Sequence, residues 1–147
     1  MGNGIAQVAA SAGHDVYLLD VSEAELEGAR SAIDNSLVRL TRRETMTPEQ
    51  AAETLERLRF TTDLAEAVRA ADVVVEAVPE ELELKRDVFA RVVEHAPLHC
   101  LLATNTSQLS ITSIGAELGD AAERLVGAHF FNPPPIMRLV ERIAGAA

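Results

Sequence analysis

The sequence predicts an α/β domain with a parallel, doubly wound sheet, and two observations carry that prediction. Short apolar runs rich in Val and Leu alternate with longer segments of helical periodicity along the whole chain. Near-continuous apolar strands are typical of parallel sheets that helices cover on both faces, and strand–helix–strand repeats favour that arrangement. The 147 residues suit one domain with a proper core, so we expect residues 1–147 to form a single domain.

The first part of the chain contains three predicted helices. The first covers Gly2–Ser11 and ends near Gly13, because glycine favours helix C-termini. Ser22 and Glu25 form a capping-box pattern that starts a long helix. Thr47-Pro48 starts a third helix, with proline at a position where its missing N–H costs nothing. One short strand is predicted at residues 15–20, between the first two helices, and another at residues 58–61, after the third.

The second part of the chain contains four predicted strands, at residues 72–78, 100–104, 125–130 and 137–143. The strand at 72–78 is expected to be buried and to end at Pro79. A brief helix begins at Asp63, and a longer helix after Pro79 carries an apolar face of Leu84, Val88, Phe89, Val92 and Val93. The last strand follows the turn of Pro133–Pro135. We therefore expect repeated strand–helix–strand units in one sheet.

Charge and cysteine content argue against several classes of partner. A formal net charge of −10 disfavours nucleic acid or an anionic membrane as the main partner, but not a phosphorylated small molecule. No segment resembles a signal peptide or is long enough to span a bilayer. The single cysteine, Cys100, provides no disulfide framework and fits a reducing compartment, so we expect a cytoplasmic location. His14, His95 and His99 lack metal-ligand spacing with Cys100, so we expect no metal site.

Polar residues follow four of the predicted strands where each strand ends. They are Asp20, Glu80, Asn105–Ser107 and Asn132. In open α/β sheets, ligands bind beyond the carboxyl ends of the strands. The agreement across four strands predicts a ligand site along this edge.

His129 stands at the end of an apolar strand, and Glu141 lies on the next predicted strand. Imidazole exchanges a proton near neutral pH, and a carboxylate on its other nitrogen fixes the tautomer. With Asn132 nearby, these groups are the parts of a hydride-transfer site. The alternative for His129 alone is a satisfied core histidine beside a proline turn.

A helix that starts at Gly2, followed by a strand that ends at Asp20, matches the second half of a Rossmann dinucleotide fingerprint. The Asp20 carboxylate would accept hydrogen bonds from the adenosine ribose and repel a 2′-phosphate, which favours NAD over NADP. Alternatively, Asp20 only caps the helix that follows. The first half of the fingerprint is absent, since Gly2 and Gly4 alone are a weak match. We therefore expect a Rossmann-like sheet that lacks its first strand, either because Met1 is internal to a longer protein or because the chain is a damaged copy.

Five ordered motifs resemble the 3-hydroxyacyl-CoA dehydrogenase family, including bacterial 3-hydroxybutyryl-CoA dehydrogenases. They are Met1-Gly-Asn-Gly-Ile-Ala-Gln7, Val16-Tyr-Leu-Leu-Asp20, Val75-Glu-Ala-Val-Pro-Glu80, Asn105-Thr-Ser107 and His129-Phe-Phe-Asn-Pro-Pro134 with Leu139-Val-Glu141. The resemblance covers the whole chain as that family's NAD-binding domain. The His-Phe-Phe-Asn-Pro form is more similar to the monofunctional dehydrogenases than to the large fatty-oxidation enzymes.

The resemblance implies a role for each matching catalytic residue. His129 is the acid–base that takes the proton of the 3-hydroxyl, and Glu141 holds and polarises its imidazole. Ser107 hydrogen-bonds the substrate oxygen and helps to set the nicotinamide. From the residues alone, the alternative for Ser107 is a simple cap of the helix that follows it.

The same resemblance implies contacts to cofactor and substrate. Cofactor contacts fall on Gly2, Asp20, Glu80, Lys85, Asn105 and Asn132, and CoA contacts on Ser36 and Arg43. Each has an ordinary structural alternative. For Glu80 the alternative is a carboxylate that only interacts with the helix dipole, as in the first turn of any helix. For Lys85 it is an ordinary solvated lysine, and for the arginines at 39, 42 and 43 it is a solvated helix face.

The resemblance implies NAD-dependent oxidation of a (3S)-3-hydroxyacyl-CoA to the 3-ketoacyl-CoA, or the reverse. The family's helical C-terminal half, which closes the acyl pocket and forms the homodimer, has no counterpart here, so we expect weak or no activity from these residues alone. Two alternatives remain: a non-catalytic remnant or NAD-binding module, and a related dehydrogenase of another 3-hydroxy acid. Acyl-chain length and pathway, such as fatty-acid or butanoate metabolism, stay open.

Overall fold

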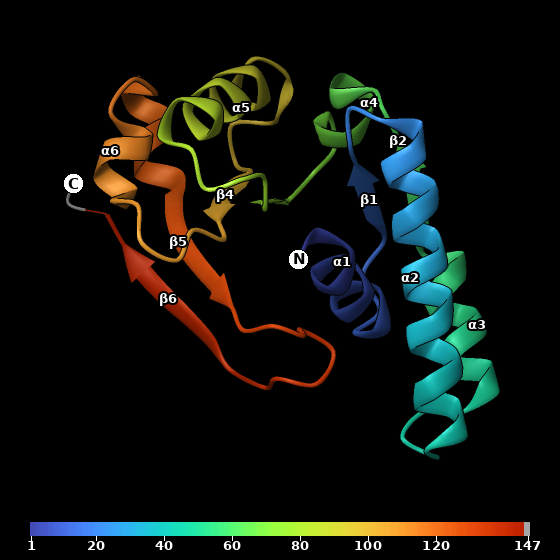
Figure 1. Cartoon of the computed structure of the whole chain (residues 1–147). Coiled ribbons are helices and arrows are strands. Elements are labelled where there is room, and N and C mark those ends of the chain that lie inside the picture. Colours follow the sequence, from blue (N-terminus) through green and yellow to red (C-terminus); the bar gives the residue numbers. More distant parts are fainter. Residues whose placement is uncertain (146–147) are drawn as a thin grey trace. The chain divides into compact units, whose positions relative to one another are not determined.

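The computed structural model describes residues 1–145, which fall into two compact units. The N-terminal unit comprises Met1–Asp63 with Pro133–Ile136, and the C-terminal unit comprises Leu64–Asn132 with the segment from Met137 onward. Figure 1 traces both along the chain. Within residues 1–145, no helix has the length and apolar character needed to cross a bilayer.

The N-terminal unit is a pair of parallel strands with three helices. Its elements in chain order are α1 (Gly2–Ser11), β1 (Val16–Leu19), α2 (Glu23–Arg42), α3 (Pro48–Glu56) and β2 (Leu58–Thr61). Val16 of β1 pairs with Leu58 of β2, and the register continues to Leu19 and Thr61. Its core is formed by Ala6, Ala10, Ile33, Leu37 and Leu58.

The helix ends in this unit follow the predicted capping chemistry. Ser22 accepts a hydrogen bond from the Glu25 backbone N–H at the start of α2. Thr47 and Gln50 form a complete capping box at the start of α3. Gly13 follows α1 at φ +96°, a conformation in which a side chain would be strained. The predicted helix starts at Ser22 and Thr47 and the helix end near Gly13 are therefore confirmed, and of the capping box predicted at Ser22 the bond from the Glu25 N–H is formed.

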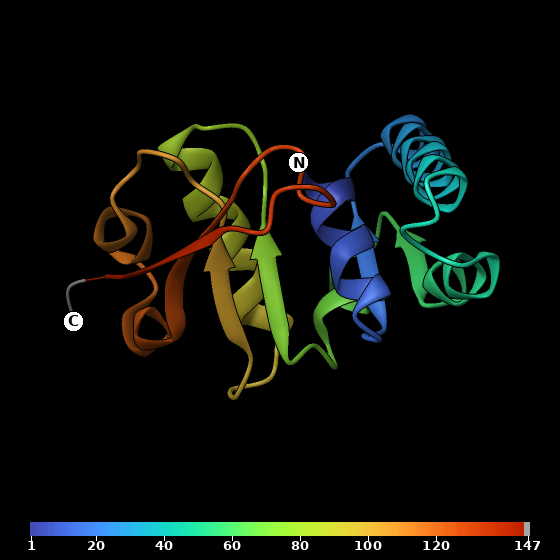
Figure 2. The same ribbon diagram turned by 90° about the horizontal axis from the view of Figure 1, so that it is seen from below.

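The C-terminal unit is a four-stranded sheet with helices and one 3₁₀ turn. Its elements are α4 (Leu64–Val68), β3 (Val73–Glu76), α5 (Leu82–His95), β4 (Leu101–Thr104), α6 (Ile111–Gly115), η1 (Gly119–Arg124), β5 (Leu125–Phe130) and β6 (Val140–Ala144). The strand order is β3-β4-β5-β6, with β3, β4 and β5 parallel. In Figure 2 the arrowheads of β3 and β4 point to the same end of the sheet.

The last strand runs against the others. β6 pairs antiparallel with β5, and Figure 1 shows the two arrows in opposite directions. The predicted parallel sheet is therefore confirmed for β3, β4 and β5, and it ends in one antiparallel strand. A parallel return needs a crossover connection of a dozen or more residues, usually helical, whereas the short proline-rich segment between β5 and β6 only reverses the chain.

One face of this sheet forms the core and the other is partly open. Phe89 and Val92 of α5 pack with Leu102 of β4 and Ile114 of α6. On β3, Val73 and Val75 are 53% and 36% exposed. The prediction of a fully buried strand at 72–78 is therefore wrong, because alternate residues of β3 face away from the helices that cover the core.

The strands form two separate ladders instead of the single predicted sheet. Among residues 1–145, β1 pairs with β2 alone and β3 pairs with β4 alone. The alternation of parallel strands and helices nevertheless persists through both units, so the predicted α/β class is confirmed.

Candidate active site

His129 and Glu141 form a cross-strand pair in the C-terminal unit. The register of β5 and β6 sets the two residues directly opposite each other. The Nδ1 atom of His129 lies 2.8 Å from Oε2 of Glu141. Because a carboxylate only accepts hydrogen bonds, Nδ1 carries the proton and Nε2 presents its lone pair. The imidazole is thus held as a base whose free nitrogen faces away from the carboxylate.

The hydroxyl group of Ser107 contacts that free nitrogen. Its Oγ lies 3.1 Å from His129 Nε2, and the tautomer set by Glu141 makes the hydroxyl the donor. Ser107 is exposed, whereas the His129 side chain is 19% exposed. A carboxylate, an imidazole and a hydroxyl therefore form one chain of hydrogen bonds that ends at an accessible oxygen. The ring of Phe131 lies 4.9 Å from the imidazole, centroid to centroid.

Asn105 fixes the backbone beside His129. Its Oδ1 accepts a 2.8 Å hydrogen bond from the N–H of Phe130. The bond ties the residue that follows β4 to the last residue of β5, since Thr104 and Phe130 end those strands. Asn105, which is predicted to contact the cofactor, therefore also fixes the backbone next to His129.

Glu80 binds the loop that carries Ser107. Its Oε1 accepts hydrogen bonds from the Thr106 hydroxyl, from the Ser107 N–H at 2.9 Å and from the Gln108 N–H at 3.2 Å. Burial raises the pKa of Glu80, but these hydrogen bonds and the charge of Lys85 outweigh it and hold the pKa below its usual value. Glu80 is therefore ionised at neutral pH and holds the loop as an anion.

Lys85 is buried, not a solvated surface lysine. It is 1% exposed, and its Nζ lies 2.8 Å from Glu76 Oε1, 3.2 Å from the carbonyl of Val78 and 3.4 Å from Glu80 Oε2. The spacing of Lys85, Phe89 and Val92 puts the lysine on the buried face of α5. The spacing of Lys85 from the apolar residues Phe89 and Val92 thus indicated a buried position. The residue type alone did not, because most lysines in a helix rich in charged residues are exposed to solvent.

Sequence reasoning missed Glu76 and Thr104 as members of the site. The Glu76 side chain is fully buried and its Oε2 accepts a 2.7 Å hydrogen bond from Thr104 Oγ1. A glutamate that ends a run of three valines is a recognisable signal, because an apolar strand buries a charge only with a partner.

In the N-terminal unit, the residues predicted for the adenosine side follow α1 and β1. α1 starts at Gly2, and its first turn contains no acidic residue. Asp20 follows β1 directly, and its Oδ1 accepts a 3.2 Å hydrogen bond from the Ser22 N–H. Asp20 thus makes the local turn considered as its structural alternative, with one of its two oxygens.

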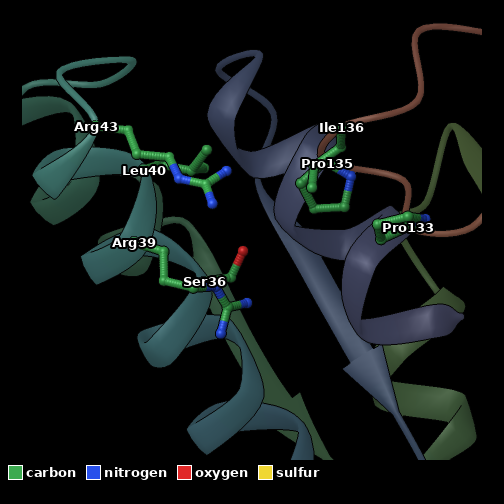
Figure 3. A pocket seen from close by; sticks show the side chains of 7 residues that line it. All are labelled: Ser36, Arg39, Leu40, Arg43, Pro133, Pro135 and Ile136. Atoms are coloured by element: carbon green, nitrogen blue, oxygen red, sulfur yellow. The ribbon is translucent and has the colours of Figure 1, made fainter.

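A pocket on α2 contains both residues predicted to contact CoA. Ser36, Arg39, Leu40 and Arg43 line one side of it, and Pro133, Pro135 and Ile136 line the other, as Figure 3 shows. Its volume is about 80 Å³, far below the several hundred Å³ of a typical ligand site. The pocket therefore suits one small group, such as a phosphate, and not a whole nucleotide.

The structure brings together Glu80, Lys85, Asn105, Ser107, His129 and Glu141 in the C-terminal unit. Gly2, Asp20, Ser36 and Arg43 belong to the N-terminal unit, and Asn132 is exposed after β5. That all four strand ends meet at one edge stays a prediction. Within the described range, no group of three His, Cys, Asp or Glu side chains has a geometry that could hold a metal ion.

Comparison with known proteins agrees with this geometry. Residues 1–147 match the family model described as "3-hydroxyacyl-CoA dehydrogenase, NAD binding domain". The chain is 49% identical to 3-hydroxyadipyl-CoA dehydrogenase of Escherichia coli, covering 100% of this chain and 30% of that protein. It is 45% identical to mitochondrial hydroxyacyl-coenzyme A dehydrogenase of Rattus norvegicus, covering 97% and 47%. The chain therefore spans a third to a half of the length of these relatives.

Solved structures give the same result. The crystal structure of 3-hydroxybutyryl-CoA dehydrogenase from Escherichia coli matches with a TM-score of 0.93 at 47% identity, covering 100% of this chain and 31% of that one. The (S)-3-hydroxybutyryl-CoA dehydrogenase of Ralstonia eutropha matches at 0.93 and 37% identity, covering 99% and 50%. The predicted Rossmann-like fold and its cofactor, NAD, are confirmed by these matches. The chain belongs to the 3-hydroxyacyl-CoA dehydrogenase family, as its NAD-binding domain.

Proposed function

We propose that this chain supplies the NAD site and the catalytic base for oxidation of a (3S)-3-hydroxyacyl-CoA to the 3-ketoacyl-CoA, or for the reverse reaction. The hydrogen-bonded chain Glu141–His129–Ser107 is the observation that carries the proposal. Relatives named as dehydrogenases of 3-hydroxyadipyl-CoA and 3-hydroxybutyryl-CoA support the substrate class. Location in the cytoplasm and homodimerisation through a helical domain remain parts of the same proposal.

In this reaction His129 moves the proton. The 3-hydroxyl of the substrate takes the place that the Ser107 hydroxyl now shares, and Nε2 accepts its proton. Glu141 stabilises the imidazolium that results, because its carboxylate lies 2.8 Å from Nδ1. Ser107 then donates to the substrate oxygen and fixes its position. The acceptor for the hydride that leaves C3 would be supplied by NAD bound in this domain.

The residues present fit NAD in both units. At the N-terminus of α1, the positive end of the helix dipole and the absence of an acidic residue in the first turn suit a pyrophosphate. The second oxygen of Asp20 remains for a ribose hydroxyl, because Ser22 uses only Oδ1. Glu80, Asn105 and Asn132 would hold the nicotinamide side.

The α2 pocket fits the phosphorylated end of CoA. Arg39 and Arg43 supply guanidinium groups beside the Ser36 hydroxyl, and the opposite wall is apolar. Guanidinium groups bind phosphate through paired N–H donors. A phosphate next to an apolar contact is the chemistry of CoA, not of a free hydroxy acid. This favours the CoA ester over the 3-hydroxy acids considered as an alternative.

A hydrolytic function is the strongest competitor, because a carboxylate, an imidazole and a serine also compose a nucleophilic triad. Such a site needs N–H donors for an oxyanion, commonly next to the nucleophile. Here the N–H groups of Ser107 and Gln108 both donate to the Glu80 carboxylate. A negative charge thus occupies the place of the oxyanion, which favours proton transfer over acyl transfer.

A substitution of His129 in the full-length protein tests whether this residue is the catalytic base. We expect His129→Gln to lower kcat for 3-hydroxybutyryl-CoA oxidation by about 10²- to 10⁴-fold, the usual contribution of a general base. The Kd for NAD, measured by calorimetry, should stay within about 2-fold, because His129 contributes a proton site and no binding charge. His95→Gln, on the exposed end of α5, is the control. A collapse of NAD affinity with normal turnover of the bound enzyme would refute the assignment.

A further inference from the structure

A buried ion pair lies beneath the loop that carries Ser107. Lys85 Nζ is 2.8 Å from Glu76 Oε1, and both side chains are at most 1% exposed. The ammonium also faces the Val78 carbonyl and Glu80 Oε2. Glu76 in turn accepts hydrogen bonds from the Val78 N–H and Thr104 Oγ1, each at 2.7 Å. The ammonium thus makes two hydrogen bonds and a further ion pair, and both oxygens of the Glu76 carboxylate have a hydrogen-bond partner.

A pair of this kind is weak evidence for stability. Desolvation of two charges offsets much of their attraction, and replacement of such pairs by apolar residues is often neutral for folding. Glu76 ends β3 and Thr104 ends β4, so the pair lies at the sheet edge that carries the site. The position of the ion pair next to the site indicates a role other than stabilisation of the core.

The hydrogen bonds connect the pair to the reacting groups. Lys85 contacts one oxygen of Glu80, and the other oxygen binds the N–H groups of Ser107 and Gln108. Thr104 Oγ1 also accepts from the N–H of Thr106, at 3.3 Å. The same loop carries Ser107, whose Oγ faces His129 Nε2.

We propose that Glu76 and Lys85 are positioning residues, which hold Glu80 and the 104–108 loop so that the Ser107 hydroxyl meets His129. This inference rests on the proposed role of His129. It gives Lys85 a task in addition to the direct cofactor contact that the family resemblance implies, because its ammonium faces three protein acceptors. Glu76, which the sequence analysis did not single out, becomes the anchor of the arrangement.

A neutral double variant separates positioning from folding. Glu76→Gln with Lys85→Met keeps both shapes and leaves no unpaired charge in the interior. We expect it to fold, with an unchanged far-ultraviolet circular dichroism spectrum. The Ser107 amide and His129 ring resonances in the NMR spectrum should shift, and kcat should fall about 10-fold or more, since small displacements of reacting groups are costly. The Kd for NAD should change less than kcat.

Two further variants keep the test decisive. Glu83→Gln removes an exposed ion pair with Arg86 on the same helix and should leave both resonances and kcat unchanged. Thr104→Val removes one bond to Glu76 without any charge and should shift the Ser107 and His129 resonances even if the double variant fails to fold. A folded double variant or Thr104→Val variant with wild-type resonances and kcat would overturn the inference. The NMR result stands apart from turnover, so failure of the proposed function in the His129→Gln experiment remains distinguishable.

Discussion

The two candidate binding regions of this chain are built in opposite ways. In the C-terminal unit, the groups around His129 come from several strands, two loops and one helix, and hydrogen bonds and ion pairs connect them to the buried pair of Glu76 and Lys85. In the N-terminal unit, the α2 pocket takes its polar groups from a single helix, and its arginines are exposed. The first region holds reacting groups in one geometry, whereas the second offers charge to a ligand. Substitutions in the first should therefore change kcat, and substitutions in the second should change KM.

The largest effect within this comparison is expected at Glu141. Glu141→Gln keeps the size of the side chain but removes the charge that stabilises the imidazolium. We expect kcat to fall about 10²-fold with little change in KM, because the lost interaction strengthens only as the proton arrives. Steady-state kinetics of 3-hydroxyacyl-CoA oxidation measure both constants. Glu94→Gln, exposed on α5, is the matched control. An equal loss in both variants, or a loss confined to KM, would contradict the role of Glu141.

A smaller effect is expected in the α2 pocket. Arg43→Ala should raise the KM for the CoA substrate about 5-fold at constant kcat, because an exposed charge-assisted hydrogen bond contributes about 1 kcal/mol. Arg42→Ala is the control, since Arg42 lies next in sequence but outside the pocket. The effect should shrink at high salt, where exposed charges are screened.

Equal effects of the Arg42 and Arg43 substitutions would show that only the overall charge of α2 matters. The α2 pocket would then have no specific binding role, and only the arrangement around His129 in the C-terminal unit would remain as evidence for the comparison. A change in kcat at Arg43 would break the contrast itself, because it would couple the pocket to the reacting groups.

The sequence predicted best what depends on local patterns. The bounds of β2 and β5 agree with the predicted strands, and the caps at Ser22 and Thr47 form as expected. The contact between His129 and Glu141 was also foreseeable, since two adjacent strands joined by a short turn must pair. These features need only periodicity, capping chemistry and chain length.

Other features depend on packing between distant segments. The spacing of Lys85 to Phe89 and Val92 indicates the buried face of α5, but Glu76, the residue that pairs its charge, lies on another element. The open face of β3 also depends on which elements cover the sheet. The roles of the site residues rest on resemblance and geometry, and they stay predictions until the variants are measured.

The smallest effect is expected from acid, and it concerns how firmly Glu80 holds its loop. The pKa of Glu80 lies below its usual value, so its hydrogen bonds to the loop are complete above the ordinary pKa of a glutamate and are lost as the pH falls through the lowered value. The amide resonances of Ser107 and Gln108 should therefore titrate together, with a midpoint below the ordinary pKa of a glutamate, whereas amides of the α2 pocket should not follow them. Glu80→Gln should abolish this titration and Glu81→Gln should preserve it. A midpoint at or above the value of an ordinary glutamate would mean that Glu80 does not hold the loop as an anion, and the most rigid part of the site would lose its explanation.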